Sequence, residues 1–91
     1  MRLRWTTPAA QDLYEITQHI RHDNPTAARQ VAKTIYDGCA SLRDFPQRGR
    51  RGRKEGTREL ILPGLPYIVV YRIRNESIEI SRIYHGAQNR Q

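Results

Sequence analysis

The chain has 91 residues, of which 37% are hydrophobic and 27% are charged, which is enough for one domain spanning residues 1–91 and excludes a second hydrophobic core. A single cysteine excludes an internal disulfide bond, and no apolar run reaches the roughly 18 residues of a membrane helix, so we expect a cytoplasmic protein with no membrane partner. The formal net charge of +7 favours an acidic partner, either nucleic acid or an acidic protein.

The first half of the chain predicts a short strand followed by two helices. Residues 2–5 are typical of a short strand, and Thr7 followed by Pro8 predicts a helix capped by Thr7 with the proline at its first position. Asn24 and Pro25 predict the cap and first residue of a second helix. The apolar residues recur at helical spacing and define one face of each helix: Ala10, Leu13, Ile16 and Ile20, then Ala28, Val31, Ile35 and Leu42.

The second half of the chain predicts a loop and three strands. No periodicity is present from residue 44 to residue 56, whereas residues 57–62, 67–73 and 78–84 are typical of strands joined by short turns. Short connections make neighbouring strands antiparallel. The expected fold class is therefore α+β: an antiparallel helical hairpin packed on a small antiparallel sheet, formed by the short first strand and a three-stranded C-terminal meander, with the other sheet face open.

Positive charge is concentrated in the loop between the second helix and the meander. Residues 43–58 hold seven basic residues against the two acids Asp44 and Glu55. This block accounts for +5 of the net charge of +7 and indicates an electrostatic binding surface. The binding candidates lie in this block and on the middle strand of the meander: Arg48, Arg50, Arg51, Arg53, Lys54, Arg58 and Arg72.

Arg, Tyr and His side chains recur along the predicted strands, and such a set suits RNA cleavage. The reaction needs a base for the 2′-hydroxyl, stabilisation of charge on the phosphorus, and an acid for the 5′-oxygen. His exchanges protons near neutral pH, Arg holds negative charge, and Tyr stacks on a base or donates a proton. If the chain is a nuclease, the catalytic candidates are Arg58, Arg82, Tyr84 and His85.

Strand alternation argues against a single site made of these residues. It predicts that Arg82 and Tyr84 share a face with Ile78 and Ile80, whereas His85 lies on the opposite face. The set meets on one face only if a strand end twists.

Structural roles also remain open for the His and Tyr residues. A single His just after a strand is more often a surface or capping residue than a catalytic one, and Tyr67 and Tyr71 are more often half-buried core residues. His19 and His22 lack the spacing of metal ligands, so the sequence indicates neither a metal site nor a cofactor.

Four short motifs occupy the last third of the chain: Gly-Thr-Arg-Glu-Leu at 56–60, Pro-Tyr at 66–67, Val-Tyr-Arg at 70–72 and Arg-Ile-Tyr-His at 82–85. Together with the order of helix, helix, basic loop and meander, they resemble the RelE/ParE superfamily of type II toxins, over residues 5 to about 89. The resemblance implies a toxin that causes growth arrest, contributes to plasmid stabilisation, and is neutralised by an antitoxin. One branch of the superfamily cleaves mRNA on the ribosome, and another inhibits DNA gyrase.

The chain differs from the ribonuclease branch at several positions. That branch carries an Arg three residues before the Tyr of its Val-Tyr pair, where this chain has Ile68. It carries two alternating Lys on the preceding strand, where this chain has Arg58 and Leu60. Its Arg and Tyr beyond the last strand would fall in the tail 86–91, which contains an Arg but no Tyr.

The end of the last strand separates the branches further. His85 matches a His of YoeB-like nucleases, but there a Tyr follows it and here Gly86 does. Residues 70–73 and 80–85 instead resemble the ParE pattern of a Tyr-Arg strand and an Arg-Val-Leu-His ending. The resemblance therefore favours a ParE-like gyrase inhibitor.

Two other functions remain as alternatives: a metal-independent, ribosome-dependent mRNA endoribonuclease, and a non-toxic nucleic-acid-binding module. For either toxin, the resemblance implies a hetero-oligomer with a cognate antitoxin. The basic block leads us to expect an acidic, partly disordered antitoxin that binds across the helical hairpin and the basic segment.

Overall fold

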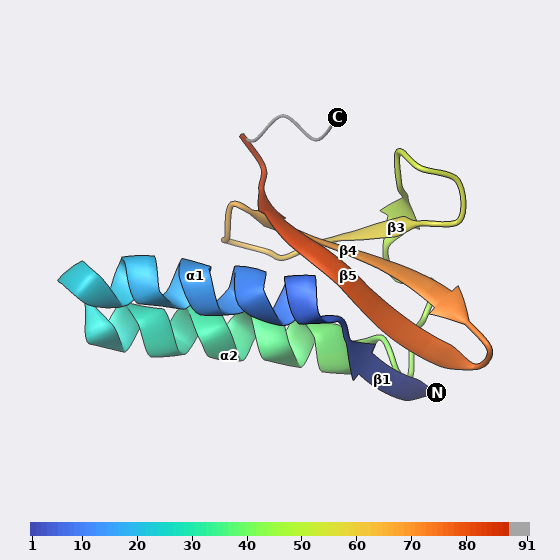
Figure 1. Cartoon of the computed structure of the whole chain (residues 1–91), viewed down its shortest axis with the longest axis horizontal. Coiled ribbons are helices and arrows are strands. Elements are labelled where there is room, and N and C mark those ends of the chain that lie inside the picture. Colours follow the sequence, from blue (N-terminus) through green and yellow to red (C-terminus); the bar gives the residue numbers. More distant parts are fainter. Residues whose placement is uncertain (88–91) are drawn as a thin grey trace.

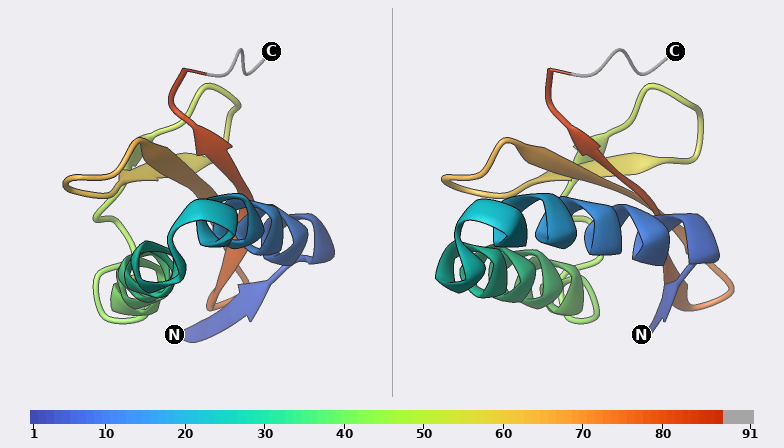
Figure 2. Two further views of the ribbon diagram at one scale, coloured as in Figure 1. Left: turned by 90° about the vertical axis from the view of Figure 1, so that its left-hand side faces the viewer. Right: turned by 60° about the vertical axis from the view of Figure 1, so that its left-hand side comes forward.

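The structure, a computed structural model, describes residues 1–87. Its elements in chain order are β1 (Arg2–Trp5), α1 (Thr7–Asp23), α2 (Pro25–Ser41), β2 (Arg50–Arg51), β3 (Arg58–Ile61), β4 (Tyr67–Arg74) and β5 (Ser77–His85). The two helices lie side by side and cover one face of a twisted sheet, while the opposite face is left open (Figures 1 and 2). The predicted α+β fold class is confirmed.

Helix α1 begins one residue before the predicted start. Thr6, not Thr7, is the N-cap: its Oγ1 accepts a hydrogen bond from the Ala9 backbone N–H at 3.2 Å. The same hydroxyl donates to the Ile80 carbonyl at 2.9 Å, and the Thr6 backbone N–H donates to that carbonyl at 3.1 Å. These contacts with β5 explain why Thr6, and not Thr7, is the N-cap of α1. They join segments far apart in the chain, so the local sequence does not reveal them.

Asn24 joins the two helices by itself, as the sequence predicts for the start of α2. Its side-chain Oδ1 accepts from the Ala27 N–H at 3.0 Å, and its own N–H donates to the Ile20 carbonyl of α1 at 2.9 Å. Because one residue ends α1 and caps α2, the helices must return alongside each other as a tight hairpin.

The apolar faces of the helices are close to those predicted. In α1 the buried alanine is Ala9, whereas the predicted Ala10 is exposed. In α2, Ile35 is fully buried, as expected. Three other predicted core residues are partly buried and pack against the core: Leu13, Ile16 and Val31.

The sheet has the order β1-β5-β4-β3-β2 and differs from the predicted sheet in two details. Strand β1 pairs with β5 in parallel, with Leu3 opposite Ile78, so the sheet is mixed and not wholly antiparallel. The rule that short connections make strands antiparallel does not apply here, since both helices lie between β1 and the meander. The second difference is β2, whose two residues are too few to show a periodicity.

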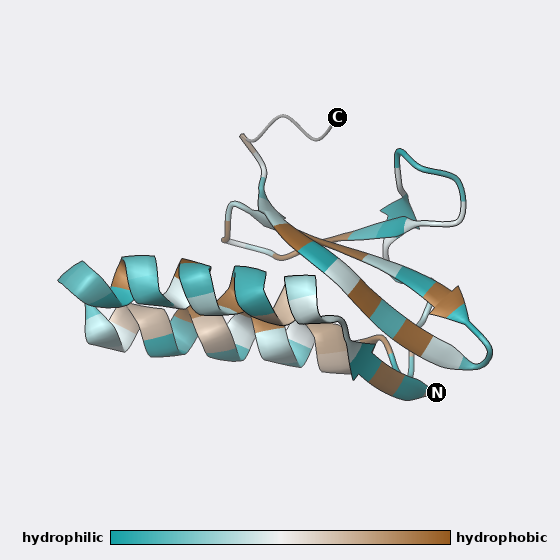
Figure 3. Cartoon of the chain, viewed as in Figure 1, coloured by the Kyte–Doolittle hydropathy of each residue, from teal (hydrophilic) through white to brown (hydrophobic). Residues whose placement is uncertain are grey.

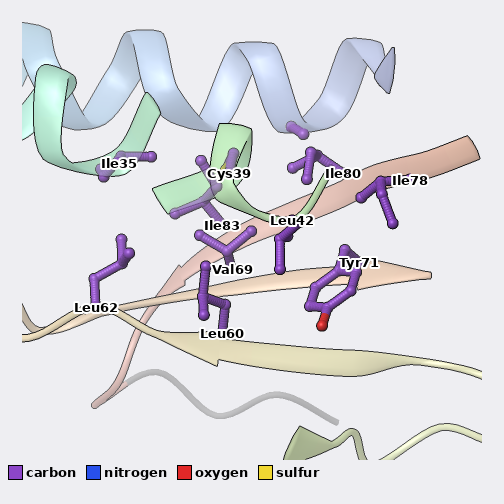
Figure 4. Close-up of a cluster of buried hydrophobic side chains, with 11 residues drawn as sticks. Ile35, Cys39, Leu42, Leu60, Leu62, Val69, Tyr71, Ile78, Ile80 and Ile83 are labelled. Atoms are coloured by element: carbon purple, nitrogen blue, oxygen red, sulfur yellow. The ribbon is translucent and has the colours of Figure 1, made fainter. Parts of the chain in front are cut away.

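The core lies between the helical hairpin and the covered face of the sheet. Apolar residues alternate with polar ones along β5, as the bands in Figure 3 show, and Figure 4 shows the apolar side chains that meet beneath α2. Gly38 of α2 is buried, and a Cβ there would lie 2.4 Å from the Leu62 Cδ2. The glycine therefore allows α2 to approach the sheet closely. Burial raises the pKa of the nearby Cys39 thiol to about 12, so this side chain is an unreactive core residue.

Candidate functional site

A β-bulge in β5 decides which side chains reach the open face of the sheet. Val70 pairs with Arg82 and the next residue, Tyr71, pairs with Ile80, so Ser81 has no opposite residue on β4. An extra residue of this kind interrupts the strict alternation of side chains along a strand.

The prediction that Arg82 and Tyr84 share a face with Ile78 and Ile80 is consequently wrong, whereas their predicted separation from Ile83 holds, since Ile83 is in the core. Ile78 and Ile80 point into the core, but Arg82 pairs with the non-core residue Val70, so Arg82 and Tyr84 lie on the face opposite the two isoleucines. The bulge therefore brings the two residues onto the open face, which they share with Arg72 of β4. The alternation of apolar and polar residues in the sequence does not reveal where a bulge inserts an extra residue.

These side chains line a hollow of about 130 Å³ on the open face, here called the open-face depression. Its lining comes from the loop before β3 and from β3, β4 and β5: Arg53, Lys54, Thr57, Glu59, Val70, Arg72, Ser81, Arg82 and Tyr84. Four of these residues are basic and one is acidic, so the depression is positively charged.

Arg82 is held at the rim of the depression by Asp12 of α1. The Arg82 Nε and Nη2 atoms lie 2.7 and 3.1 Å from the two carboxylate oxygens, and the Ile83 backbone N–H donates to the same carboxylate at 2.9 Å. The guanidinium also lies 5.4 Å from the centre of the Tyr84 ring. The hydrogen bond with Asp12 raises the pKa of Arg82 above its ordinary value. Sequence reasoning missed Asp12, because its partner lies 70 residues away.

Arg72 and Ser81 differ from Arg82 in having unused polar atoms. Arg72 Nε and Ser81 Oγ are buried, and neither has a hydrogen-bond partner within residues 1–87. Glu79, which lies directly opposite Arg72 on β5, forms its ion pair with Arg4 of β1. Glu59, which also lines the depression, is buried and accepts from Arg50 Nη2 at 3.0 Å.

The basic segment, residues 43–58, is fixed to the sheet by the hydroxyl of Tyr71. The hydroxyl donates to the Pro46 carbonyl at 2.7 Å and accepts from the Gly49 N–H at 2.9 Å. Arg58 Nη1 donates to the Gly49 carbonyl at 2.7 Å. Gly49 is buried, and a Cβ there would lie 2.7 Å from the Tyr71 ring, so the backbone packs directly on the aromatic side chain.

The tip of the basic segment closes on itself around Thr57. The Thr57 hydroxyl and backbone N–H both donate to the Lys54 carbonyl, at 2.6 and 3.1 Å, and the Gly52 N–H donates to the Thr57 carbonyl at 2.8 Å. These bonds hold Arg53 and Lys54 at the edge of the open-face depression.

The structure separates the four catalytic candidates. Arg82 and Tyr84 line the open-face depression, whereas Arg58 lines a different hollow with Arg51. His85 is exposed at the end of β5, where its ring meets that of Tyr67 edge-on at 5.6 Å and its Nδ1 accepts from the Ala87 N–H at 3.1 Å. The tail compared with the nuclease pattern lies largely outside the described residues.

The seven binding candidates also lie in different places on the protein surface. Arg53, Lys54 and Arg72 line the open-face depression. Arg48 donates to the Ser41 hydroxyl at 2.7 Å, and Arg50 binds Glu59. The other two candidates belong to the second hollow: Arg51 and Arg58.

A second surface lies on the helical hairpin, which the sequence analysis proposed as part of the antitoxin-binding surface without identifying the residues that form it. An apolar hollow of about 490 Å³, here called the hairpin groove, is lined by Trp5, Ala10, Leu13, Tyr14, Thr17, Ala32 and Tyr36. The rings of Trp5 and Tyr36 stack with their centres 6.0 Å apart. Tyr14 and Tyr36 are 59% and 57% exposed, so the groove presents aromatic surface to solvent. Within residues 1–87, neither helix is long and apolar enough to span a bilayer.

Comparison with known proteins places this fold in a family. A family model for the ParE toxin of the type II toxin–antitoxin system parDE matches residues 3–90. The toxin candidate Y4kP of Sinorhizobium fredii is 41% identical over 87 residues, which cover 96% of this chain and 90% of that protein. Toxin RelE2 of Caulobacter vibrioides is 31% identical over 84 residues, which cover 92% of this chain and 93% of that protein.

Solved structures similar to this chain also come from type II toxin–antitoxin systems. A chain of the chromosomal ParDE toxin–antitoxin system from P. aeruginosa has a TM-score of 0.87 and 30% identity, over 93% of this chain and 95% of that chain. A chain of the RelBE2 toxin–antitoxin complex from Mycobacterium tuberculosis has a TM-score of 0.59 and 27% identity, over 92% of this chain and 95% of that chain. The protein described here therefore belongs to the ParE toxin family and is a type II toxin of the RelE/ParE superfamily.

Proposed function

We propose that the chain arrests growth by binding DNA gyrase, which then stalls with cleaved DNA, as is described for ParE toxins. The observation that carries the proposal is the separation of the nuclease candidates: His85 and Arg58 lie away from the depression that Arg82 and Tyr84 line. The TM-score of 0.87 with the ParDE chain, against 0.59 with the RelBE2 chain, supports the same branch. The proposal requires the protein to act in the cytoplasm.

Geometry makes the separated set a poor catalyst of RNA cleavage. A general base must come within hydrogen-bonding reach of the proton it removes, and the charge-stabilising group must meet the same phosphate. His85 caps the backbone of Ala87 and packs on Tyr67, and the charge of Arg82 is paired with Asp12. Binding an acidic surface needs no such convergence. The exposed basic side chains of residues 43–58 are suited to it, as is the half-buried Arg72.

The second candidate function is a ribosome-dependent mRNA endoribonuclease. The observation in its favour is that Arg72, Arg82 and Tyr84 share the open face, because the bulge at Ser81 aligns them. The 31% identity with toxin RelE2 of Caulobacter vibrioides also supports this second candidate.

Controlled expression in bacteria separates the two functions if mRNA integrity and plasmid topology are followed together during growth arrest. We expect broken or abnormally supercoiled plasmid with intact mRNA. His85→Ala should arrest growth as strongly as the parent, since its ring is outside the open-face depression. Arg74→Ala, which removes an exposed charge at the far end of β4, is the control for expression and charge. Codon-position mRNA cleavage that disappears in His85→Ala would instead establish the nuclease function.

We also propose that the antitoxin occupies the hairpin groove with an apolar segment and the basic segment with acidic side chains. The groove offers stacked, exposed aromatic rings, which are frequent anchors of protein interfaces. The charge of +5 over residues 43–58 supports an acidic partner. One segment of an acidic antitoxin would then contact both the hairpin groove and the basic segment.

Removing an aromatic side chain from the hairpin groove should weaken the toxin–antitoxin complex without unfolding the toxin. Tyr36→Ala removes an exposed ring, and we expect antitoxin affinity to fall at least about tenfold, as for an aromatic anchor. Ile61→Ala, an exposed apolar residue outside the groove, should leave the affinity unchanged. Raising the salt concentration should also weaken the parent complex. Affinity that is insensitive to both Tyr36→Ala and salt, measured by calorimetry, would contradict this docking surface.

A further inference from the structure

The hairpin groove continues beyond Thr17 and Ala32 toward the turn between the two helices. A second hollow of about 240 Å³, here called the tip hollow, shares these two residues with the groove. Farther along, it is lined by Arg21 of α1 and by Ala28 and Arg29 of α2. The two hollows therefore form one depression along the seam of the hairpin, from the aromatic stack at one end to the hairpin turn at the other.

The two ends of this seam differ in chemistry. Among residues 1–87, the hairpin groove is lined by no charged side chain, and the tip hollow is lined by two arginines and no acid. Arg21 and Arg29 are exposed, and neither forms an ion pair within the described part of the chain. Asp23, the acid nearest to them in sequence, does not line the hollow. An occupant of the whole seam must therefore be apolar over the groove and acidic over the tip hollow.

The walls of the seam favour a helical occupant. Apart from Trp5 they belong to α1 and α2, whose backbone groups are bonded within the helices, so an extended segment would find no row of backbone partners there. A helix satisfies its own backbone and can lay an apolar face into such a groove. From Ala10 to Arg21 the seam rises by about 16 Å along α1, which is the length of roughly three helical turns.

The tip hollow is separate from the basic segment. Figure 1 shows the hairpin turn at one end of the molecule and the basic segment toward the other, along a longest dimension of 39 Å. A partner that lies in the seam therefore meets positive charge at the hairpin turn independently of any contact with residues 43–58.

We propose that Arg21 and Arg29 determine which antitoxin the toxin accepts, by binding acidic side chains at one end of an amphipathic antitoxin helix whose apolar face occupies the hairpin groove. The proposal rests on the antitoxin docking proposed above and adds a specificity contact to it. Exposed ion pairs add little affinity, but a helix that brings basic side chains to the tip hollow would be repelled by both arginines. The pair thus acts mainly by rejecting antitoxins of the wrong charge pattern.

Two synthetic peptides of about 14 residues test this proposal on the full chain, since each would form about three to four helical turns. They share an amphipathic sequence that lacks tryptophan, and two positions at one end are Glu in the first peptide and Lys in the second. Trp5 is the single tryptophan of the toxin and lines the hairpin groove, so its fluorescence reports occupancy. We expect the Glu peptide to bind the parent at least about tenfold more tightly than the Lys peptide.

Variants separate the two arginines from the overall positive charge of the toxin. Combining Arg21→Gln with Arg29→Gln should reduce the preference for the Glu peptide to about threefold or less. Combining Arg2→Gln with Arg74→Gln removes the same charge from exposed positions outside the seam, and it should leave the preference within about twofold of the parent. An equal loss of preference in both double variants would overturn the proposal.

The outcomes distinguish this proposal from the docking on which it rests. If both peptides change the Trp5 fluorescence and bind the parent equally, the hairpin groove is a docking surface and the role of Arg21 and Arg29 is overturned. If neither peptide changes the fluorescence, both the docking and the specificity contact are contradicted. Calorimetry with the cognate antitoxin gives a further check: Arg21→Glu combined with Arg29→Glu should lower its affinity at least about tenfold, and an unchanged affinity would overturn the proposal.

Discussion

Tyr71 shows how one side chain links the core of the protein to its basic surface. Its ring is fully buried among the apolar residues beneath α2, and Figure 4 shows its hydroxyl at the edge of that cluster. There the hydroxyl bridges Pro46 and Gly49. The sequence predicts a strand tyrosine that is half-buried, but the two hydrogen-bond partners lie 25 and 22 residues away, and no local pattern reveals them.

Replacing Tyr71 with Phe should detach the basic segment while leaving the core filled. The Gly49 N–H would lose its acceptor in a buried position, so the free energy of unfolding should fall by about 1–3 kcal/mol. Urea denaturation measures this loss, and hydrogen exchange at the Gly49 amide should become faster. Tyr67→Phe removes a hydroxyl with no hydrogen bond inside the described residues, and it should change stability by less than about 0.5 kcal/mol. Equal stability of the two variants would contradict this role of Tyr71.

The same substitution should alter the pH dependence of stability. Burial raises the pKa of Tyr71 above its ordinary value of 10.0. In alkaline solution the unfolded chain therefore loses this proton first, so stability is complete below pH 10 and falls above it. Tyr71→Phe should show a smaller fall on the alkaline side. An identical fall in both proteins would show that Tyr71 does not cause it.

At the scale of elements, the periodicity of the sequence predicts the regular helices and strands but not the bulge or the pairing of distant segments. Both helices, the meander and its turns follow from the apolar spacing and the turn residues. The bulge at Ser81, the parallel pairing of β1 and the two-residue β2 depend on contacts between distant segments. The candidate site was affected most, because a single inserted residue moves Arg82 and Tyr84 to the other face.

The β4–β5 turn offers a stabilising substitution at this scale. Asn75 and Glu76 have φ values of 49° and 62°, which is the left-handed region required at both positions of a tight hairpin turn. Glycine adopts this region without strain, so Glu76→Gly should raise the free energy of unfolding by about 0.5–1 kcal/mol after its greater entropy in the unfolded chain is included. Glu76→Ala removes the same charge and keeps the Cβ, so it should not stabilise. A lower melting temperature for Glu76→Gly than for Glu76→Ala would contradict this explanation.

For the whole molecule, the sequence predicts that one sheet face is covered and one is open, and the structure adds two surfaces of opposite character. The hairpin groove is apolar and aromatic, whereas the open-face depression is polar and positively charged. Asp12 connects them, because it belongs to the hairpin and holds both Arg82 and the backbone of β5. A partner that moves α1 would therefore act on Arg82 as well. The sequence predicts that the antitoxin binds across the hairpin but not that a groove lies there, since Trp5 and Tyr36 come from elements that meet only in the folded chain.

The most direct test of the proposed function is the amount of DNA that becomes covalently linked to purified gyrase when the toxin is added with plasmid DNA and ATP. We predict that linked, cleaved DNA increases with toxin concentration and that the antitoxin abolishes the increase. His85→Ala should have the activity of the parent protein in this assay. No increase in linked DNA, together with cleavage of mRNA on translating ribosomes by the same preparation, would contradict the account.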